Sequence, residues 1–143
     1  MTRRTAADGL VAFEAMLWLM AAAVVRQVLP FSALVALAGR PTRSPRGGDN
    51  GRIGKGQQVG WAVTVMARRL PWSPACFDQA LAAQTMLRWR RVPSTMFFGA
   101  GWNSARALEA HVWVRQGGHA VVGCELASGF MTLASFPPSG LEP

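Results

Sequence analysis

Residues 72–81 read Trp-Ser-Pro-Ala-Cys-Phe-Asp-Gln-Ala-Leu, and this stretch decides how the rest of the chain is interpreted. Ser73 suits the N-cap of a helix, and Pro74 suits its first position, where proline's missing amide N–H costs nothing. The helix can run from there to about Arg91. Cys76 then lies in the first turn, where unpaired amide N–H groups stabilise a thiolate. Cys76 is therefore a candidate nucleophile, although a cysteine between Ala and Phe is also typical of a protein core.

Before this stretch the chain is predicted to be mostly helical. Apolar residues recur at helical spacing over residues 10–29, and Pro30 ends that pattern. Residues 31–38 can form a short second helix, and residues 57–70 can form a third. The segment 40–56 has the glycine and proline punctuation of a loop and carries five cations and one anion. We expect this basic segment to be flexible, either as a solvated connector or as a docking site for an acidic chain.

After Pro93 the sequence changes from helical patterns to short β-prone runs. We expect strands at 96–99, 110–115, 120–124 and 130–136. Helices followed by strands are typical of an α+β domain, in which N-terminal helices pack on a small antiparallel sheet.

Length and composition fit a single domain. The chain has 143 residues, of which 50% are apolar and 15% charged, so it can form a core and is not disordered. We expect one domain over residues 1–143, with apolar helices at 1–39, the basic flexible loop at 40–56 and a core at 57–137. The net charge of +8 is compatible with an acidic partner or a carboxylate-rich surface.

Two cysteines and two histidines are too few for a disulfide framework or a four-ligand structural zinc site. We therefore expect no metal and an intracellular protein with free thiols. The uninterrupted apolar run 15–25 is too short to span a bilayer about 30 Å thick, so we expect a buried or amphipathic helix rather than a membrane anchor. Its broad apolar face contains Leu10, Phe13, Leu17, Ala21, Val24 and Val28.

Histidine is the usual base for a cysteine nucleophile, and the chain offers only His111 and His119. In a strand over 110–115, alternation places His111 and Trp113 on one face. His119 lies at the expected hairpin turn, beside two glycines, where exposure to solvent is typical. A strand histidine can equally be structural, and the presence of Cys76 is what favours His111 as a catalytic base.

Residues 57–137 contain an ordered set of short motifs. They are Arg69-Leu-Pro71, Cys76 followed by Phe77-Asp-Gln-Ala-Leu-Ala-Ala83, Ala110-His-Val-Trp-Val114, Val121-Val-Gly123 and the closing Phe130-x-x-Leu-x-x-Phe-Pro137. Together they resemble the lasso peptide biosynthesis B2 proteins, transglutaminase-like cysteine peptidases that remove the leader from a ribosomally made precursor peptide. The resemblance implies a transglutaminase-like, papain-like fold in which 57–137 is the catalytic core, Cys76 the nucleophile and His111 the base.

The resemblance also implies partners. In this family a small leader-binding domain is either fused ahead of the peptidase or made as a separate chain. Only residues 1–56 precede the resembling region, so we expect a discrete peptidase that works with a separate leader-binding protein of the B1 or RRE type. An ATP-using macrolactam synthetase would act next in the pathway. We further expect a cytoplasmic enzyme with no cofactor, no nucleic-acid partner and no stable membrane insertion.

The third member of the site departs from the family pattern. In the family an Asp twelve residues after the His often completes the pair, and that position here is Gly123. If the hairpin pairs Gly123 with His111, Glu125 falls on the same sheet face at about 7–8 Å, and its side chain can reach the imidazole. Glu125 is thus our candidate acid. If Cys124 pairs with His111 instead, Glu125 points away, and the site is a dyad with a backbone carbonyl or water on the imidazole. Gly123→Asp restores the family's acid if the backbone there accepts a side chain.

Trp72 and Trp113 are candidate substrate-binding residues, since aromatic side chains can form the walls of a cleft. The cations within 88–91 suit a helix C-terminus and do not by themselves indicate nucleic-acid binding. Two alternative functions stay open. One is a non-catalytic basic module that binds nucleic acid or peptide, and the other is an acyl transferase that uses the same Cys-His chemistry with an amine acceptor.

Overall fold

The computed structural model describes residues 6–30, 32–33, 36, 49–116 and 118–136. Along this part of the chain helices precede strands, which confirms the α+β prediction. The elements are α1 (Ala6–Val28), α3 (Asp49–Arg69), α4 (Cys76–Trp89), β1 (Thr95–Trp102), β2 (Leu108–Gln116), β3 (His119–Val122), the 3-10 helix η1 (Cys124–Gly129) and β4 (Met131–Phe136). Most of the helix predicted at 31–38, and the loop residues 40–48, lie outside the described residues.

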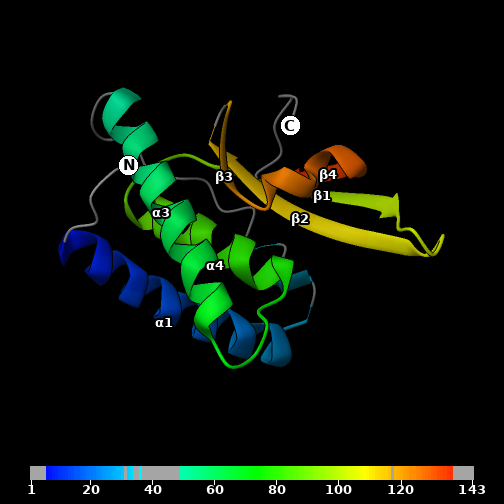
Figure 1. Ribbon diagram of the computed structural model, residues 1–143, viewed down its shortest axis with the longest axis horizontal. Coiled ribbons are helices and arrows are strands. Elements are labelled where there is room, and N and C mark those ends of the chain that lie inside the picture. Colours follow the sequence, from blue (N-terminus) through cyan, green and yellow to red (C-terminus); the bar gives the residue numbers. More distant parts are fainter. Residues whose placement is uncertain (1–5, 31, 34–35, 37–48, 117, 137–143) are drawn as a thin grey trace.

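The strands form one antiparallel sheet in the order β3-β2-β1-β4, so β2 is an inner strand. β1 and β2 pair along their length, with Gly99 opposite His111. β3 stays paired only as far as Val122, which lies opposite Val114. Figure 1 shows α1, α3 and α4 gathered to one side and the sheet to the other. His111 therefore lies on an inner strand, close to the point where β3 leaves the sheet.

α4 is the helix around which the other elements pack. Eight of its 14 residues are buried, and α1, α3 and β2 all contact it. The small side chains of Ala80, Ala82 and Ala83 let neighbouring elements approach its axis closely. The shared core includes Leu19, Val59, Val63, Met86, Leu87, Val112 and Val114. Close packing on several sides fixes the place of the first residue of α4 relative to the sheet.

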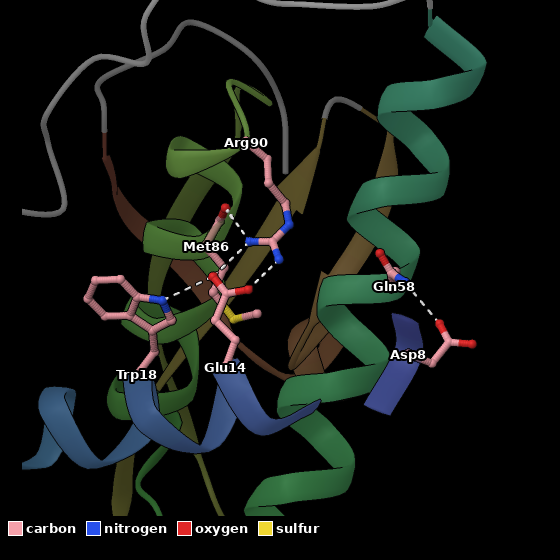
Figure 2. A network of polar contacts seen from close by, with 6 residues as sticks. All are labelled: Asp8, Glu14, Trp18, Gln58, Met86 and Arg90. Carbon is pink, nitrogen blue, oxygen red and sulfur yellow. Dashed lines mark hydrogen bonds and ion pairs between the residues drawn. The ribbon is translucent and has the colours of Figure 1, made fainter. Parts of the chain in front are cut away.

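Two ion pairs fasten α1 across α4. Near the start of α4, Arg26 Nε donates to Asp78 Oδ1 at 2.8 Å, and Asp78 is only 1% exposed. Just after the end of α4, the Arg90 guanidinium binds both carboxylate oxygens of Glu14, and the indole N–H of Trp18 donates to the same carboxylate at 3.3 Å (Figure 2). The two helices are therefore held together at both ends of their contact.

α1 packs on the domain through its small residues. Ala15, Leu19 and Ala22 turn inward. The larger apolar residues of the predicted broad face are exposed on the outside, among them Leu10, Phe13, Leu17, Val24 and Val28. By length and composition α1 could cross a membrane: an 18-residue window has a mean hydropathy of 1.7, and 17% of it is buried. A core helix or a signal sequence can have the same character. The apolar pattern over 10–29 thus predicted the helix correctly, but it did not predict which face of the helix packs on the domain.

α3 begins at Asp49, before the helix predicted at 57–70. The flexible loop predicted over 40–56 is therefore wrong for its second half. Glycine is typical of loops, yet Gly51, Gly54 and Gly56 lie within this helix. A Cβ at Gly51 or Gly54 would meet open space, and one at Gly56 would meet the end of the flexible Gln116 side chain. The packing of α3 on α1, α4 and β3 thus overrides the low helix propensity of these glycines.

The contact between Glu14 and Arg90 predicts an acid dependence of stability. Hydrogen bonding by Arg90 lowers the pKa of Glu14 below its ordinary 4.5, and partial burial opposes this shift with a smaller effect. Because the folded-state pKa is the lower one, the contact stabilises the fold above about pH 4.5 and is lost as pH falls through the lowered value. We expect Glu14→Gln to lower the free energy of unfolding by about 1 kcal/mol at pH 7, measured by urea unfolding.

The difference between wild type and Glu14→Gln should shrink toward pH 3. A difference that stays constant from pH 7 to pH 3 would contradict the prediction. Glu109→Gln is the control. Glu109 lies exposed on β2, and within the described chain its carboxylate accepts a hydrogen bond from the Asn103 side chain alone.

Candidate functional site

α4 begins at Cys76, which confirms that this cysteine lies in the first turn of a helix. The predicted cap is wrong, since Ser73 and Pro74 both precede the helix and Ala75 is the N-cap, without a side-chain hydrogen bond. Gln79 Nε2 instead donates to the Pro74 carbonyl at 3.1 Å and ties the segment before the helix to its first turn. The first amide N–H groups of a helix lack partners within it, so they are free to stabilise negative charge beside Cys76.

A cavity of about 250 Å³ lies between the start of α4, β2 and η1. Its lining includes Cys76, Gln79, His111, Gly123, Glu125 and Leu126. The fold thus brings the three residues predicted to be catalytic to one cavity, although they come from a helix, an inner strand and a 3-10 helix.

The imidazole of His111 is held in a fixed orientation. His111 is 8% exposed, and its ring packs nearly parallel to the rings of Trp113 and Phe130, with centroids 5.8 and 5.0 Å away. Its Nε2 atom lies 2.8 Å from the carbonyl oxygen of Gly123. One ring nitrogen is therefore engaged by the backbone, and Nδ1 is the nitrogen left for chemistry.

Neither of the two predicted hairpin registers extends to Glu125, because the chain leaves the sheet before that residue. β3 ends at Val122, not at 124 as predicted, and Gly123 has a left-handed φ of 75° that leads into η1. Glu125 lies exposed in the first turn of η1. In the part of the chain that the structure describes, its carboxylate makes no hydrogen bond to His111. A catalytic role for Glu125 stays a prediction.

A side chain at Gly123 does not fit this backbone. Residues with a Cβ rarely adopt a φ near 75°. A Cβ here would lie 3.0 Å from the carbonyl oxygen of Val112, 3.3 Å from Cβ of Trp113 and 3.4 Å from Nε2 of His111. Gly123→Asp restores the family's acid only if the backbone accepts a side chain, and this condition is therefore not met.

The two candidate substrate-binding tryptophans lie in different surroundings. Trp113 is 1% exposed, and its ring packs against Phe97 and His111, so it supports the imidazole. Trp72 is 38% exposed and lies outside the lining of the cavity. Substrate binding by either residue stays a prediction. His119 is exposed at the first position of β3, as expected for the hairpin end.

The residues predicted from the sequence do not include Gln79, and the backbone carbonyl offered there as a partner of the imidazole is not assigned to a residue. Gln79 follows Cys76 at the i, i+3 spacing that places two side chains on one helix face, and this signal could have found it. Gly123 contributes a backbone carbonyl, for which the sequence carries no side-chain signal.

Comparison with known proteins gives one match. A family model described as the transglutaminase-like superfamily matches residues 16–135. The match begins inside α1 and ends in β4, so it includes the cavity and every element that lines it. No curated protein and no solved structure matches the chain.

The two thiols are expected to differ in reactivity. Burial raises the pKa of the Cys124 thiol, and its Sγ donates to the Val114 carbonyl at 3.1 Å. A raised pKa leaves less thiolate, the reactive form, at a given pH. We expect iodoacetamide at pH 7.5 to label Cys76 roughly tenfold faster than Cys124, measured by peptide mass spectrometry over time. Cys124→Ala should keep the fast reaction and Cys76→Ala should remove it, whereas faster labelling of Cys124 would contradict this assignment.

Proposed function

This chain belongs to the transglutaminase-like superfamily, and from that premise we propose that it is a cysteine peptidase that removes the leader from a ribosomally made lasso precursor peptide. The observation that carries the proposal is the shared cavity of Cys76, at the start of α4, and His111, whose ring is held from Nε2. A cysteine nucleophile beside an oriented imidazole is the arrangement that acyl chemistry requires. The motifs shared with the B2 proteins support the leader as substrate.

The first half of the reaction forms an acyl-enzyme. His111 takes the thiol proton of Cys76 at Nδ1, and the thiolate attacks the carbonyl carbon of the last leader residue. Free first-turn amide N–H groups of α4 stabilise the oxyanion of the tetrahedral intermediate. The intermediate collapses as its C–N bond breaks, and the imidazolium returns the proton to the departing amine. The core peptide leaves with a free amino group.

The second half regenerates the enzyme. His111 removes a proton from water, the hydroxide attacks the thioester carbonyl, and the C–S bond of the second intermediate breaks. The leader leaves as a carboxylic acid, and the Cys76 sulfur regains a proton from the imidazolium. Among the described residues no hydrogen bond joins Cys76 Sγ to the imidazole, and such catalytic contacts often tighten only when the substrate is bound.

The remaining parts of the proposal concern partners and place. We propose that the enzyme acts in the cytoplasm with a separate leader-binding protein, ahead of a macrolactam synthetase. The net charge of +8 supports recruitment of an acidic leader or carrier. The basic segment 40–56 is the candidate docking site, and its residues 40–48 lie outside the described residues.

The proposal is tested by incubating the protein with a cognate precursor and its leader-binding protein, and weighing the products by mass spectrometry. Cys76→Ala and Cys76→Ser should abolish cleavage, because each removes the nucleophile. Cys124→Ala is the matched control and should keep most activity. Undiminished cleavage by Cys76→Ala would overturn the mechanism. A leader product that carries an added amine in place of water would show acyl transfer rather than hydrolysis.

The same assay tests the base. His111→Ala should lower the cleavage rate on the order of 100-fold or more, as expected when a general base is removed. His119→Ala should have little effect, because His119 is exposed and lies outside the cavity lining. Equal losses from the two substitutions would contradict the assignment of His111.

A further inference from the structure

We propose that the backbone carbonyl of Gly123 holds His111 in the Nε2–H tautomer. It thereby orients the imidazole, as a carboxylate does in sites that have a third, acidic residue. The inference rests on the proposed Cys-His chemistry for its functional meaning. It adds a positioning residue, Gly123, that acts through its main chain.

The hydrogen bond itself fixes the tautomer. Nε2 of His111 and the carbonyl oxygen of Gly123 are 2.8 Å apart. A carbonyl oxygen can only accept, so Nε2 must carry the hydrogen. In the neutral ring Nδ1 then has a free lone pair, which is the state that a general base needs. The partner of one nitrogen thus decides the chemistry of the other.

The backbone around Gly123 is shaped to deliver this carbonyl. β3 ends at Val122, and the left-handed φ of 75° at Gly123 turns the chain toward η1. The same conformation places the Gly123 oxygen within hydrogen-bond distance of the His111 ring. Because a Cβ here would crowd the Val112 carbonyl, the position favours glycine. The missing acid and the carbonyl contact are therefore two results of one backbone conformation.

The rings around the imidazole preserve the contact. Trp113 and Phe130 pack against it at interplanar angles of 19° and 29°. His111 is 8% exposed, so few ring orientations are open to it. Gly99, opposite His111 on β1, leaves room for the Trp113 ring, since a Cβ there would approach that ring to 2.9 Å. Packing limits the orientation of the ring, and the Gly123 oxygen selects the nitrogen that bears hydrogen.

The direct test is NMR of the full chain with ¹⁵N-labelled histidine and ¹³C-labelled glycine. The chain has only two histidines, and His119→Ala identifies the signals of His111. We expect neutral His111 to be protonated at Nε2 and to show a coupling across the hydrogen bond to the Gly123 carbonyl carbon. An Nδ1–H tautomer would overturn the proposal. This measurement needs no substrate, so its outcome is separate from that of the peptidase proposal.

A variant pair tests the consequence for catalysis. Gly123→Ala should shift the tautomer population and lower kcat for precursor cleavage about tenfold or more, with little change in KM, because the base is misoriented. Gly129→Ala, at the other end of η1, is the control: its added Cβ meets open space and its φ is not left-handed. Unchanged tautomer and kcat in a folded Gly123→Ala would contradict the proposal. If Gly123→Ala does not fold, the wild-type NMR measurement decides.

A last variant separates the carbonyl from the nearby carboxylate. Glu125 lines the same cavity, so it is the competing partner for the ring. In Glu125→Gln the Nε2–H signal and its coupling to Gly123 should persist. Loss of both in a folded protein would assign the tautomer to Glu125 and overturn the role of Gly123.

Discussion

The burial of α4 is the constraint on which the position of the site depends. α1, α3 and the sheet all pack against this helix, so its axis has little freedom to move. The ion pair of Asp78 with Arg26 lies two residues after Cys76 and fixes the first turn to α1. The amide of Gln79 fixes the segment just before it. Cys76 is thereby held by structural contacts at the lining of the cavity.

The other half of the site depends on where the chain leaves the sheet. His111 pairs with Gly99 of β1 on one side, and on its other side β3 has already left the sheet. The pairing of β3 ends at Val122. The backbone N–H and C=O groups that follow no longer bond to a strand and are available to side chains. The Gly123 carbonyl uses that freedom to bind the imidazole. A helix start and a strand end therefore meet at one cavity, and each contributes backbone groups as well as a side chain.

The sequence predicted the parts of this arrangement that depend on local pattern. The place of Cys76 in a first helical turn and the order of helices before strands follow from proline positions and hydrophobic spacing, and the structure bears them out, although the helix begins two residues later than predicted. The glycines of 49–56 predicted a loop, and the helix found there depends on the packing of α3 against α1, α4 and β3, which the local pattern does not show. The position of Glu125 could not be predicted either. A prediction from strand register needs regular alternation, and the left-handed conformation of Gly123 ends that alternation before Glu125.

Polar contacts tie α1 to the rest of the domain at both ends of its contact with α4. Arg26 pairs with the buried Asp78 near the start of α4, and Glu14 binds Arg90 just after its end. The family match begins at residue 16, so most of α1 is part of the matched domain. Its apolar outer face is therefore the surface of a helix that polar contacts and small inward residues hold against α4.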